Sequence, residues 1–189
     1  MKIKFRYFSR VLSMTVLLTM MTFSGLNSSV IAADKAISIG ASGLAGADLS
    51  ASVVYFEYEQ SIVNKLSFYA RGGQLAYDYD DGDYEEDGDG PGIEGGVRFY
   101  PSGDGLKGFF IGAGLGVWDT EWDWTDDKGT AWETTGSGDS TSAEIHFILG
   151  GRIGNKVQFV PTFQIGSFLS TDAELGAYAI LGASLSFGL

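Results

Sequence analysis

The sequence predicts an all-β fold: an eight-stranded, antiparallel, up-and-down transmembrane β-barrel preceded by a cleaved signal peptide. Three observations lead to this prediction. Apolar residues alternate with other residues over eight short stretches, no stretch shows sustained helical periodicity, and tight connections alternate with mostly longer ones. The 28 glycines, against 3 prolines, add to the bias towards a tightly packed sheet.

Residues 1–33 have the layout of a secretory signal peptide. A basic leader precedes an apolar run from Val11 to about Met21, and small residues then lead to Ala32 and Ala33. The apolar run is shorter than the roughly 20 residues of a membrane-spanning helix, so cleavage after Ala32 or Ala33 is favoured over a membrane anchor. We therefore predict a signal peptide over 1–33 and one outer-membrane β-barrel domain over 34–189.

Charge and cysteine content exclude several classes of protein. From Asp34 onward the chain keeps 8 of its 12 Lys and Arg residues and all 24 of its Asp and Glu residues, so its formal net charge is 8 − 24 = −16. A chain this acidic is not expected to bind nucleic acid, which requires a basic surface. The sequence has no cysteine, which excludes disulfides, thiolate metal sites and a lipid-anchored N-terminal Cys.

Eight stretches of the mature chain have strand-like alternation, and turn-forming residues separate them. In chain order they are Ala36–Gly43, Ser50–Ile62, Leu66–Tyr77, Ile93–Pro101, Gly108–Trp118, Ser142–Gly154, Val157–Leu169 and Gly176–Leu189.

Each stretch presents two different faces, because successive side chains of a strand point to opposite sides. In the fifth stretch, one face is apolar and the other combines glycines with aromatic rings: Phe109, Ile111, Ala113, Leu115 and Val117 against Phe110, Gly112, Gly114, Gly116 and Trp118. The second, sixth and seventh stretches repeat the pattern with charged or polar residues on the second face. A soluble barrel would bury the apolar face, whereas a membrane barrel would turn it outward, and alternation alone does not distinguish the two.

The connections favour the membrane arrangement. Three are tight and each carries a lysine: Val63–Lys65, Ser102–Lys107 and Asn155–Lys156. The others include two long acidic segments, Asp78–Gly92 and Asp119–Thr141, and two short ones near Ala47 and Asp172. Outer-membrane barrels have short periplasmic turns and longer extracellular loops, so we predict both termini on the periplasmic side.

Aromatic residues are predicted to gather at the two membrane interfaces. Near the predicted extracellular loops lie Tyr77, Trp118, Trp122 and Trp124. Near the predicted periplasmic turns lie Phe99, Tyr100 and Phe187. Because Trp122 and Trp124 alternate with acidic residues, the fifth strand is expected to continue above the membrane. Pro161 lacks an amide N–H, so a bulge or irregularity is expected there.

The last strand, Gly182-x-x-Leu185-x-Phe187, resembles the C-terminal targeting strand of bacterial outer-membrane β-barrel proteins. It departs from that pattern in Ile180, at a usually polar position, and in the final Gly188-Leu189, where an aromatic residue is usual. The stretches Gly95–Pro101 and Gly108–Gly116 also look like the small opacity/OmpX-like eight-stranded barrels. The resemblance implies a monomer in the outer membrane of a Gram-negative cell, with lipid, lipopolysaccharide and the barrel-assembly machinery as partners.

The inward face gathers most of the charged residues of the predicted barrel. They are Glu57, Glu59, Arg71, Glu94, Arg98, Glu144, His146 and Arg152. An eight-stranded barrel is just wide enough for its own side chains to fill it. We therefore favour an interior network in which carboxylates pair with guanidiniums, because unpaired buried charge is costly. The alternative is a narrow gated pore, for which the inward glycines leave room.

His146, Glu144 and Ser142 lie on one side of a single strand, and these residue types can carry nucleophilic hydrolysis. Eight-stranded lipid A deacylases use such groups. Two arguments oppose this hypothesis: residues i and i+2 of a strand are about 7 Å apart, and the alternation turns His146 into the lumen, away from lipid. One histidine without cysteine also makes a poor zinc site.

The segment Asp78–Gly92 holds eight carboxylates. Within it Asp83, Glu85, Asp87 and the later Glu94 approximate the spacing of a calcium-binding loop. The match is imperfect, since Glu85 stands where Asp or Asn is usual and strands rather than helices should flank the loop. A solvated acidic loop is favoured, with weak association of Ca²⁺ or Mg²⁺ as the alternative and no other cofactor expected.

These observations predict a non-enzymatic outer-membrane barrel that acts through acidic extracellular loops, in surface interaction, adhesion or envelope integrity. A narrow porin-like channel is the first alternative, and a lipid A-modifying hydrolase is the second. No ligand on the cell surface is indicated by the sequence.

Overall fold

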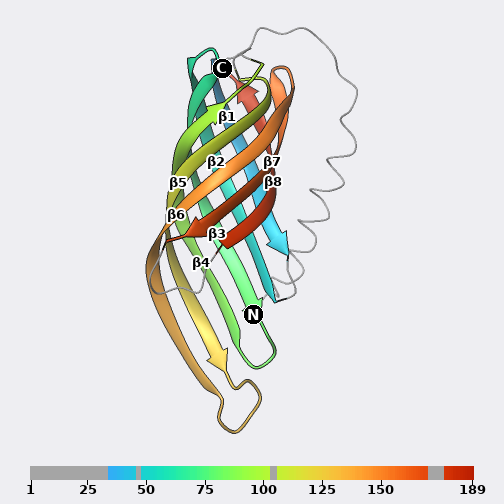
Figure 1. Cartoon of the computed structure of the whole chain (residues 1–189). Coiled ribbons are helices and arrows are strands. Elements are labelled where there is room, and N and C mark those ends of the chain that lie inside the picture. The colour runs from blue at the N-terminus through green and yellow to red at the C-terminus, as the bar shows by residue number, and fades with distance from the viewer. Residues whose placement is uncertain (1–33, 46–47, 103–105, 170–176) are drawn as a thin grey trace.

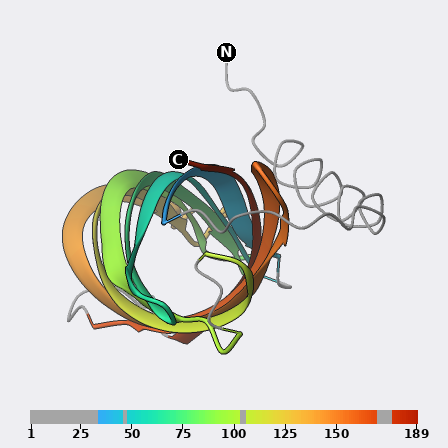
Figure 2. The ribbon, with the colours of Figure 1, turned by 90° about the horizontal axis from the view of Figure 1, so that it is seen from above.

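The computed structural model describes residues 34–45, 48–102, 106–169 and 177–189. Eight antiparallel strands follow one another around a closed barrel in which β1 pairs with β8 (Figures 1 and 2). They are β1 (Lys35–Ala45), β2 (Leu49–Val63), β3 (Leu66–Asp80), β4 (Glu85–Phe99), β5 (Gly108–Asp126), β6 (Thr134–Gly154), β7 (Val157–Phe168) and β8 (Ala177–Gly188). The predicted fold class is confirmed, while the predicted signal peptide, 1–33, lies outside the described residues.

Over the described ranges, the structure holds no helix with the length and apolar character needed to cross a membrane.

The two segments predicted as long acidic loops, Asp78–Gly92 and Asp119–Thr141, are mostly strand, so that prediction is wrong. Strands β3 and β4 pair as far as Asp80 and Glu85, and β5 and β6 pair as far as Asp126 and Thr134. The apolar alternation stops at the edge of the predicted membrane band, but inter-strand hydrogen bonding needs only backbone and continues beyond it. The β5–β6 hairpin therefore projects far past the rest of the barrel, as the prediction of a prolonged fifth strand anticipated (Figure 1).

Pro161 interrupts the sheet without shifting its register. The β6–β7 pairing runs to Gly150 opposite Thr162 and resumes in the same register at Ile153 opposite Phe159. Since proline has no amide hydrogen to donate, the ladder skips this point instead of forming a bulge. The expected irregularity is therefore present on the β6 side, whereas Pro161 still pairs with Ala183 on the other side.

The outer surface of the barrel is an apolar band. Many large hydrophobic side chains point outward and are 40% or more exposed, among them Ile93, Leu115, Val117, Phe147 and Leu149. Soluble monomers do not expose apolar surface on this scale, whereas a barrel surrounded by lipid requires it. The apolar face predicted from alternation is therefore the outward face, as the transmembrane arrangement requires.

Large aromatic side chains on the inner face lie directly opposite glycines of the neighbouring strand. Eight such pairs occur in the described sheet, and in each a Cβ on the glycine would collide with the ring: Tyr55–Gly40, Tyr69–Gly96, Tyr77–Gly88, Phe110–Gly150, Trp118–Gly92, Trp122–Gly138, Trp124–Gly136 and Tyr178–Gly166. Glycine thus makes room for a ring that would not otherwise fit inside an eight-stranded barrel.

This pairing corrects the predicted aromatic belts. Tyr77 and Trp118 are buried in the lumen at 7% and 2% exposure, and Tyr100 is buried at the opposite end. Phe99 and Phe187 do face outward, with 40% and 44% of their surface exposed. The alternation of inward and outward positions along each strand therefore predicts where these rings point better than their nearness to a predicted interface does.

A glycine opposite a ring should be far less tolerant of substitution than a glycine on the outer face. In Gly150→Ala the new Cβ would fall on the Phe110 ring and lie 2.8 Å from the Pro161 carbonyl oxygen, so we expect a loss of about 1–3 kcal/mol in unfolding free energy. In the adjacent Gly151→Ala the Cβ would meet nothing closer than the Gly108 carbonyl oxygen at 4.0 Å, so stability should change little. Urea unfolding in lipid vesicles measures both, and equal losses would contradict the interpretation.

Candidate functional site: the lumen of the barrel

Arg98 of β4 lies at the centre of the lumen and joins two carboxylates of β2. Its Nη1 donates to Glu57 Oε1 at 2.7 Å and to Glu59 Oε2 at 2.6 Å, while Nη2 donates to Glu57 Oε2 at 2.7 Å. Its guanidinium carbon lies 4.2 Å from the centroid of the Tyr69 ring and 4.7 Å from that of Phe110. Arg98 is therefore held by paired charges along its edge and by aromatic rings on its faces.

Two further arginines extend this centre in opposite directions. The tight-turn end is the end of the barrel with the β2–β3 and β6–β7 turns. Towards it, Arg152 binds Glu59 and donates from Nη1 to Ser186 Oγ at 2.6 Å. Towards the other end, Arg71 donates to Glu57 at 2.9 Å and to Glu94 at 3.1 Å. All of these arginines and glutamates are at most 7% exposed. Burial on this scale requires pairing, because an isolated charge in a barrel surrounded by lipid would be strongly destabilising.

Glu144 accepts four hydrogen bonds near the end of the barrel from which β5 and β6 project, which we call the long-strand end. His146 Nδ1 lies 2.9 Å from its Oε1, Trp118 Nε1 donates to its Oε2 at 2.6 Å, and Gln164 and Tyr178 also donate to it. The objection that side chains two residues apart on a strand cannot meet is thus wrong for Glu144 and His146, because both side chains are long enough to span the gap.

The structure does not assemble the hydrolase arrangement. His146 is fully buried, and its Nε2 lies 2.5 Å from the Tyr69 hydroxyl. The Ser142 hydroxyl makes no hydrogen bond within the described part of the chain. The histidine therefore links Glu144 to Tyr69, which leaves it turned away from both the serine and the lipid.

All eight charged residues predicted to face inward are buried in the lumen, and hydrogen bonds through Gln164 connect the Glu144 group to Arg71. The predicted network contained charged residues only, whereas in the structure it also has neutral members, which include Ser67, Tyr69, Tyr100, Gln158, Gln164, Tyr178 and Ser186. Strand parity alone places each of them on the inner face, so the signal was present in the alternation.

The tight-turn end of the lumen is closed by an apolar cluster. Leu106, from the β4–β5 connection, is 1% exposed and packs with buried residues of the surrounding strands: Ala36, Tyr100, Phe110, Ile148 and Val160. Gln158 Nε2 donates to the Leu106 carbonyl oxygen at 3.2 Å. A connection expected only to turn the chain thus also plugs the barrel.

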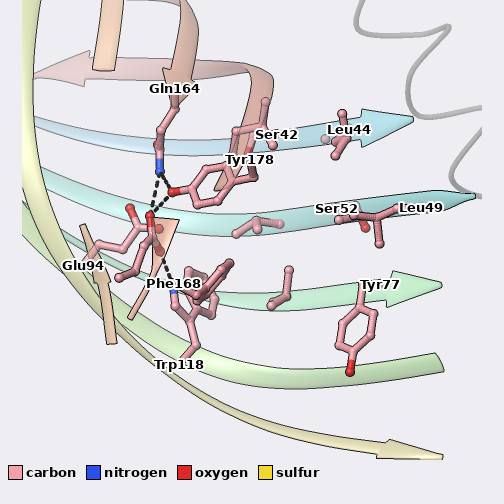
Figure 3. Close-up of a pocket in the computed structure, with 16 residues that line it drawn as sticks. Ser42, Leu44, Leu49, Ser52, Tyr77, Glu94, Trp118, Gln164, Phe168 and Tyr178 are labelled. Carbon is pink, nitrogen blue, oxygen red and sulfur yellow. Dashed lines mark hydrogen bonds between the residues drawn. The ribbon is translucent and has the colours of Figure 1, made fainter. Parts of the chain in front are cut away.

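A cavity of about 60 Å³ lies at the opposite end, where β1 ends and β2 begins (Figure 3). Its walls are largely apolar and aromatic, from Leu44, Leu49, Ala51, Val53, Leu75, Phe168 and Ile180. Polar groups of the network, including Glu94, Glu144, Gln164 and Tyr178, meet at one side of it. Gln164, Tyr178 and Trp118 each donate a hydrogen bond to Glu144, and Figure 3 shows how these three side chains lie at the polar side of the cavity.

The residues with calcium-loop spacing are not brought together. Asp83 lies in the β3–β4 turn, Glu85 and Asp87 lie on the outward face of β4, and Glu94 lies in the lumen bound to Arg71. Asp87 and Glu94 are seven positions apart along an extended strand, which corresponds to roughly 23 Å. The described residues contain no cluster of three or more metal-binding side chains suited to hold an ion. Weak cation association with the acidic surface stays a prediction.

Solved structures show where this architecture recurs. Ail, the attachment invasion locus protein of Yersinia pestis, matches with a TM-score of 0.51 and 12% identity over 83% of this chain and 97% of that one. A major outer membrane protein from Thermus thermophilus matches with a TM-score of 0.56 and 13% identity over 81% and 99%. This is the fold of the outer-membrane β-barrels. No protein-family model and no curated protein matches the sequence.

Removing the central guanidinium should destabilise the barrel severely. Arg98→Met keeps a side chain of similar length but leaves Glu57 and Glu59 without their shared partner, so we expect a loss of about 3–5 kcal/mol in unfolding free energy. Adding Glu57→Gln removes one stranded charge and should recover part of the loss. Lys65→Met, in the exposed β2–β3 turn, is the matched control. Urea unfolding in vesicles measures these free energies, and equal values for Arg98→Met and Lys65→Met would contradict the prediction.

Proposed function

We propose that this chain is a non-enzymatic protein of the bacterial outer membrane that is closed to solutes and acts through its projecting acidic strands, in surface interaction, adhesion or envelope integrity. The observation that carries the proposal is the continuous network of ion pairs from Arg152 to Glu94, which hydrogen bonds through Gln164 extend to Glu144, with the Leu106 plug beneath it. A lumen filled by locked, buried side chains is suited to an anchor and poorly suited to transport.

The outer-membrane location is supported by the apolar band and by the fold shared with Ail and the Thermus protein. Strand length supports a surface role. The 19 residues of β5 span roughly 60 Å, which at the usual tilt of barrel strands gives a height of roughly 45 Å. The apolar band of such a barrel is about 25 Å tall, so the hairpin would rise well beyond it.

The outer face of the projecting strands bears rows of carboxylates. Asp87 lies between Asp78 and Asp123 in the sheet, and Glu121 lies between Asp89 and Asp139. Like charges directly opposite one another destabilise a sheet, so a row of this kind favours neighbours that bring positive charge. We infer that its partners are cationic surfaces, or divalent cations shared with the phosphates of lipopolysaccharide.

This charge sets a contrast with one of the solved neighbours. Ail has been crystallised with the heparin analogue sucrose octasulfate, a polyanion. An anionic glycan of that kind would be repelled by the acidic rows of the present chain. If the chain is an adhesin, we therefore propose that it recognises basic partners instead.

The channel and hydrolase alternatives have less support. A channel needs a continuous aqueous path, and the Arg98–Glu57–Glu59 centre with the Leu106 plug stands in its way. A hydrolase needs a serine activated by a base at the lipid, and His146 instead contacts Tyr69 inside the lumen.

Planar bilayer recordings test whether the barrel is closed. The wild-type protein should produce no stable unit conductance steps, because side chains fill the lumen. Replacing Arg98, Glu57 and Leu106 together with Ala removes both the central bridge and the plug, and this variant, once folded, should show steps. Stable steps from the wild type would overturn the closed-barrel proposal in favour of a narrow channel.

Cysteine labelling tests the orientation, since the chain has no native cysteine. Trp132 is 80% exposed in the β5–β6 turn, and Asn64 is exposed in the β2–β3 turn at the other end. A membrane-impermeant maleimide applied to intact cells should label Trp132→Cys and spare Asn64→Cys, whereas both should react after lysis. The reverse pattern would place the termini outside, and label absent from the outer-membrane fraction would overturn the location.

A further inference from the structure

We propose that the cavity at the long-strand end of the lumen binds a small alkylammonium ion, with the cation at Glu94 and the alkyl chain against the apolar walls. This inference goes beyond the proposed anchor role. It does not depend on that role, because the cavity lies on one side of the network that closes the lumen.

The charges of the lumen point to a cation. Four buried glutamates, Glu57, Glu59, Glu94 and Glu144, face three buried arginines, Arg71, Arg98 and Arg152. Glu57 and Glu59 share all three arginines between them, while Glu94 forms a salt bridge only with Arg71 among the residues that the structure describes. The described part of the lumen thus holds one more buried glutamate than it holds buried arginines, and the two glutamates that line the cavity, Glu94 and Glu144, have no ion pair there with Arg98 or Arg152.

Glu94 is the better placed of these two to receive a ligand. Glu144 already accepts four hydrogen bonds, which use the capacity of a carboxylate. Glu94 accepts one from Arg71 at 3.1 Å. The two acids flank Gly116, whose added Cβ would lie 3.1 Å from both Glu94 Cγ and Glu144 Oε2. The same Cβ would lie 3.3 Å from Trp118 Nε1, so the two acids meet beside this indole N–H, and a cation near Glu94 would also feel the charge of Glu144.

A second polar group lines the same cavity without a partner. The Ser42 hydroxyl is buried, with the residue 8% exposed, and it makes no hydrogen bond within the described chain. Ser42 lies opposite Gly182, where β1 pairs with β8, and Figure 3 shows it among the side chains that line the cavity. A buried hydroxyl left unpaired is costly, and its oxygen can accept a hydrogen bond from an ammonium group.

The walls define the remainder of the ligand. Leu44, Leu49, Val53 and Leu75 offer aliphatic surface, and the rings of Trp118, Phe168 and Tyr178 offer faces and edges to a cation or its methylenes. A volume of about 60 Å³ holds only a few water-sized groups, so a short alkyl chain fits and a drug-sized molecule does not. The acidic rows beyond the mouth would raise the local concentration of cations.

n-Butylammonium is the probe, and the full-length mature protein folded in a non-ionic detergent is the receptor. Binding is followed through the indole N–H signal of Trp118 in ¹H–¹⁵N spectra, because this group donates to Glu144 at the edge of the cavity. The four tryptophans give four such signals, and Trp118→Phe identifies the relevant one. Titration should shift it saturably, whereas n-butanol and butyrate at equal concentrations should shift it at least about tenfold more weakly.

Two variants locate the site. Glu94→Gln removes the proposed counter-charge and should weaken butylammonium binding at least about tenfold. Ala51→Phe fills the cavity from its wall and should abolish the shift, whereas Ala70→Phe makes the same change on the outer face and should leave it intact. Heat-modifiable migration on gels confirms that each variant is folded before it is titrated.

Several results would overturn the proposal. An absent or non-saturating shift in the wild type would exclude the site, and an equal response to n-butanol would make it an apolar pocket without preference for cations. Unchanged affinity in folded Glu94→Gln or Ala51→Phe would place the binding elsewhere. None of these outcomes depends on whether the barrel conducts, so they are distinct from a failure of the proposed function.

Discussion

The structure depends on one requirement: the charges inside the barrel must neutralise one another, because lipid surrounds the barrel and the lumen is too narrow for bulk water. Arg98 meets this requirement at the centre by bridging Glu57 and Glu59 while Tyr69 and Phe110 cover its faces. A soluble barrel of the same size would fill this space with aliphatic side chains. Here the apolar residues are needed on the outside, so the core is built from ion pairs and rings.

Alternation in the sequence predicted the eight strands and placed all eight charged residues on the face opposite the apolar one, since alternation is a property of a single strand. The connections were needed to predict that the apolar face points to lipid. Which charges form pairs depends on the register between neighbouring strands, and the alternation within one strand carries no information about that register. The contact of His146 with Tyr69, 77 residues away, is of this kind. The length of β3 to β6 was underestimated for a different reason. Hydrophobic alternation reports where lipid ends, whereas backbone pairing continues through residues such as Trp122 and Asp123.

The two ends of the lumen are built differently. At the tight-turn end, Leu106 packs against Tyr100 and Phe110, and Arg152 pairs with Glu59, which Arg98 also binds. At the long-strand end, Glu94 and Glu144 share fewer cations and border a cavity with the unpaired Ser42 hydroxyl. The plugged end therefore closes the lumen, whereas the other end holds the cavity in which we propose that a cation binds.

The aromatic–glycine pairs have a consequence for how the barrel is assembled. A slip of one residue between strands is penalised everywhere, because it turns the apolar face inward. A slip of two residues preserves the faces and would otherwise be hard to reject. Such a slip would set Phe110 against Ile148 or Arg152 in place of Gly150, and Tyr69 against Glu94 or Arg98 in place of Gly96. Each glycine therefore selects the correct register between its strand and the next, because only that register places the ring opposite a residue without a side chain.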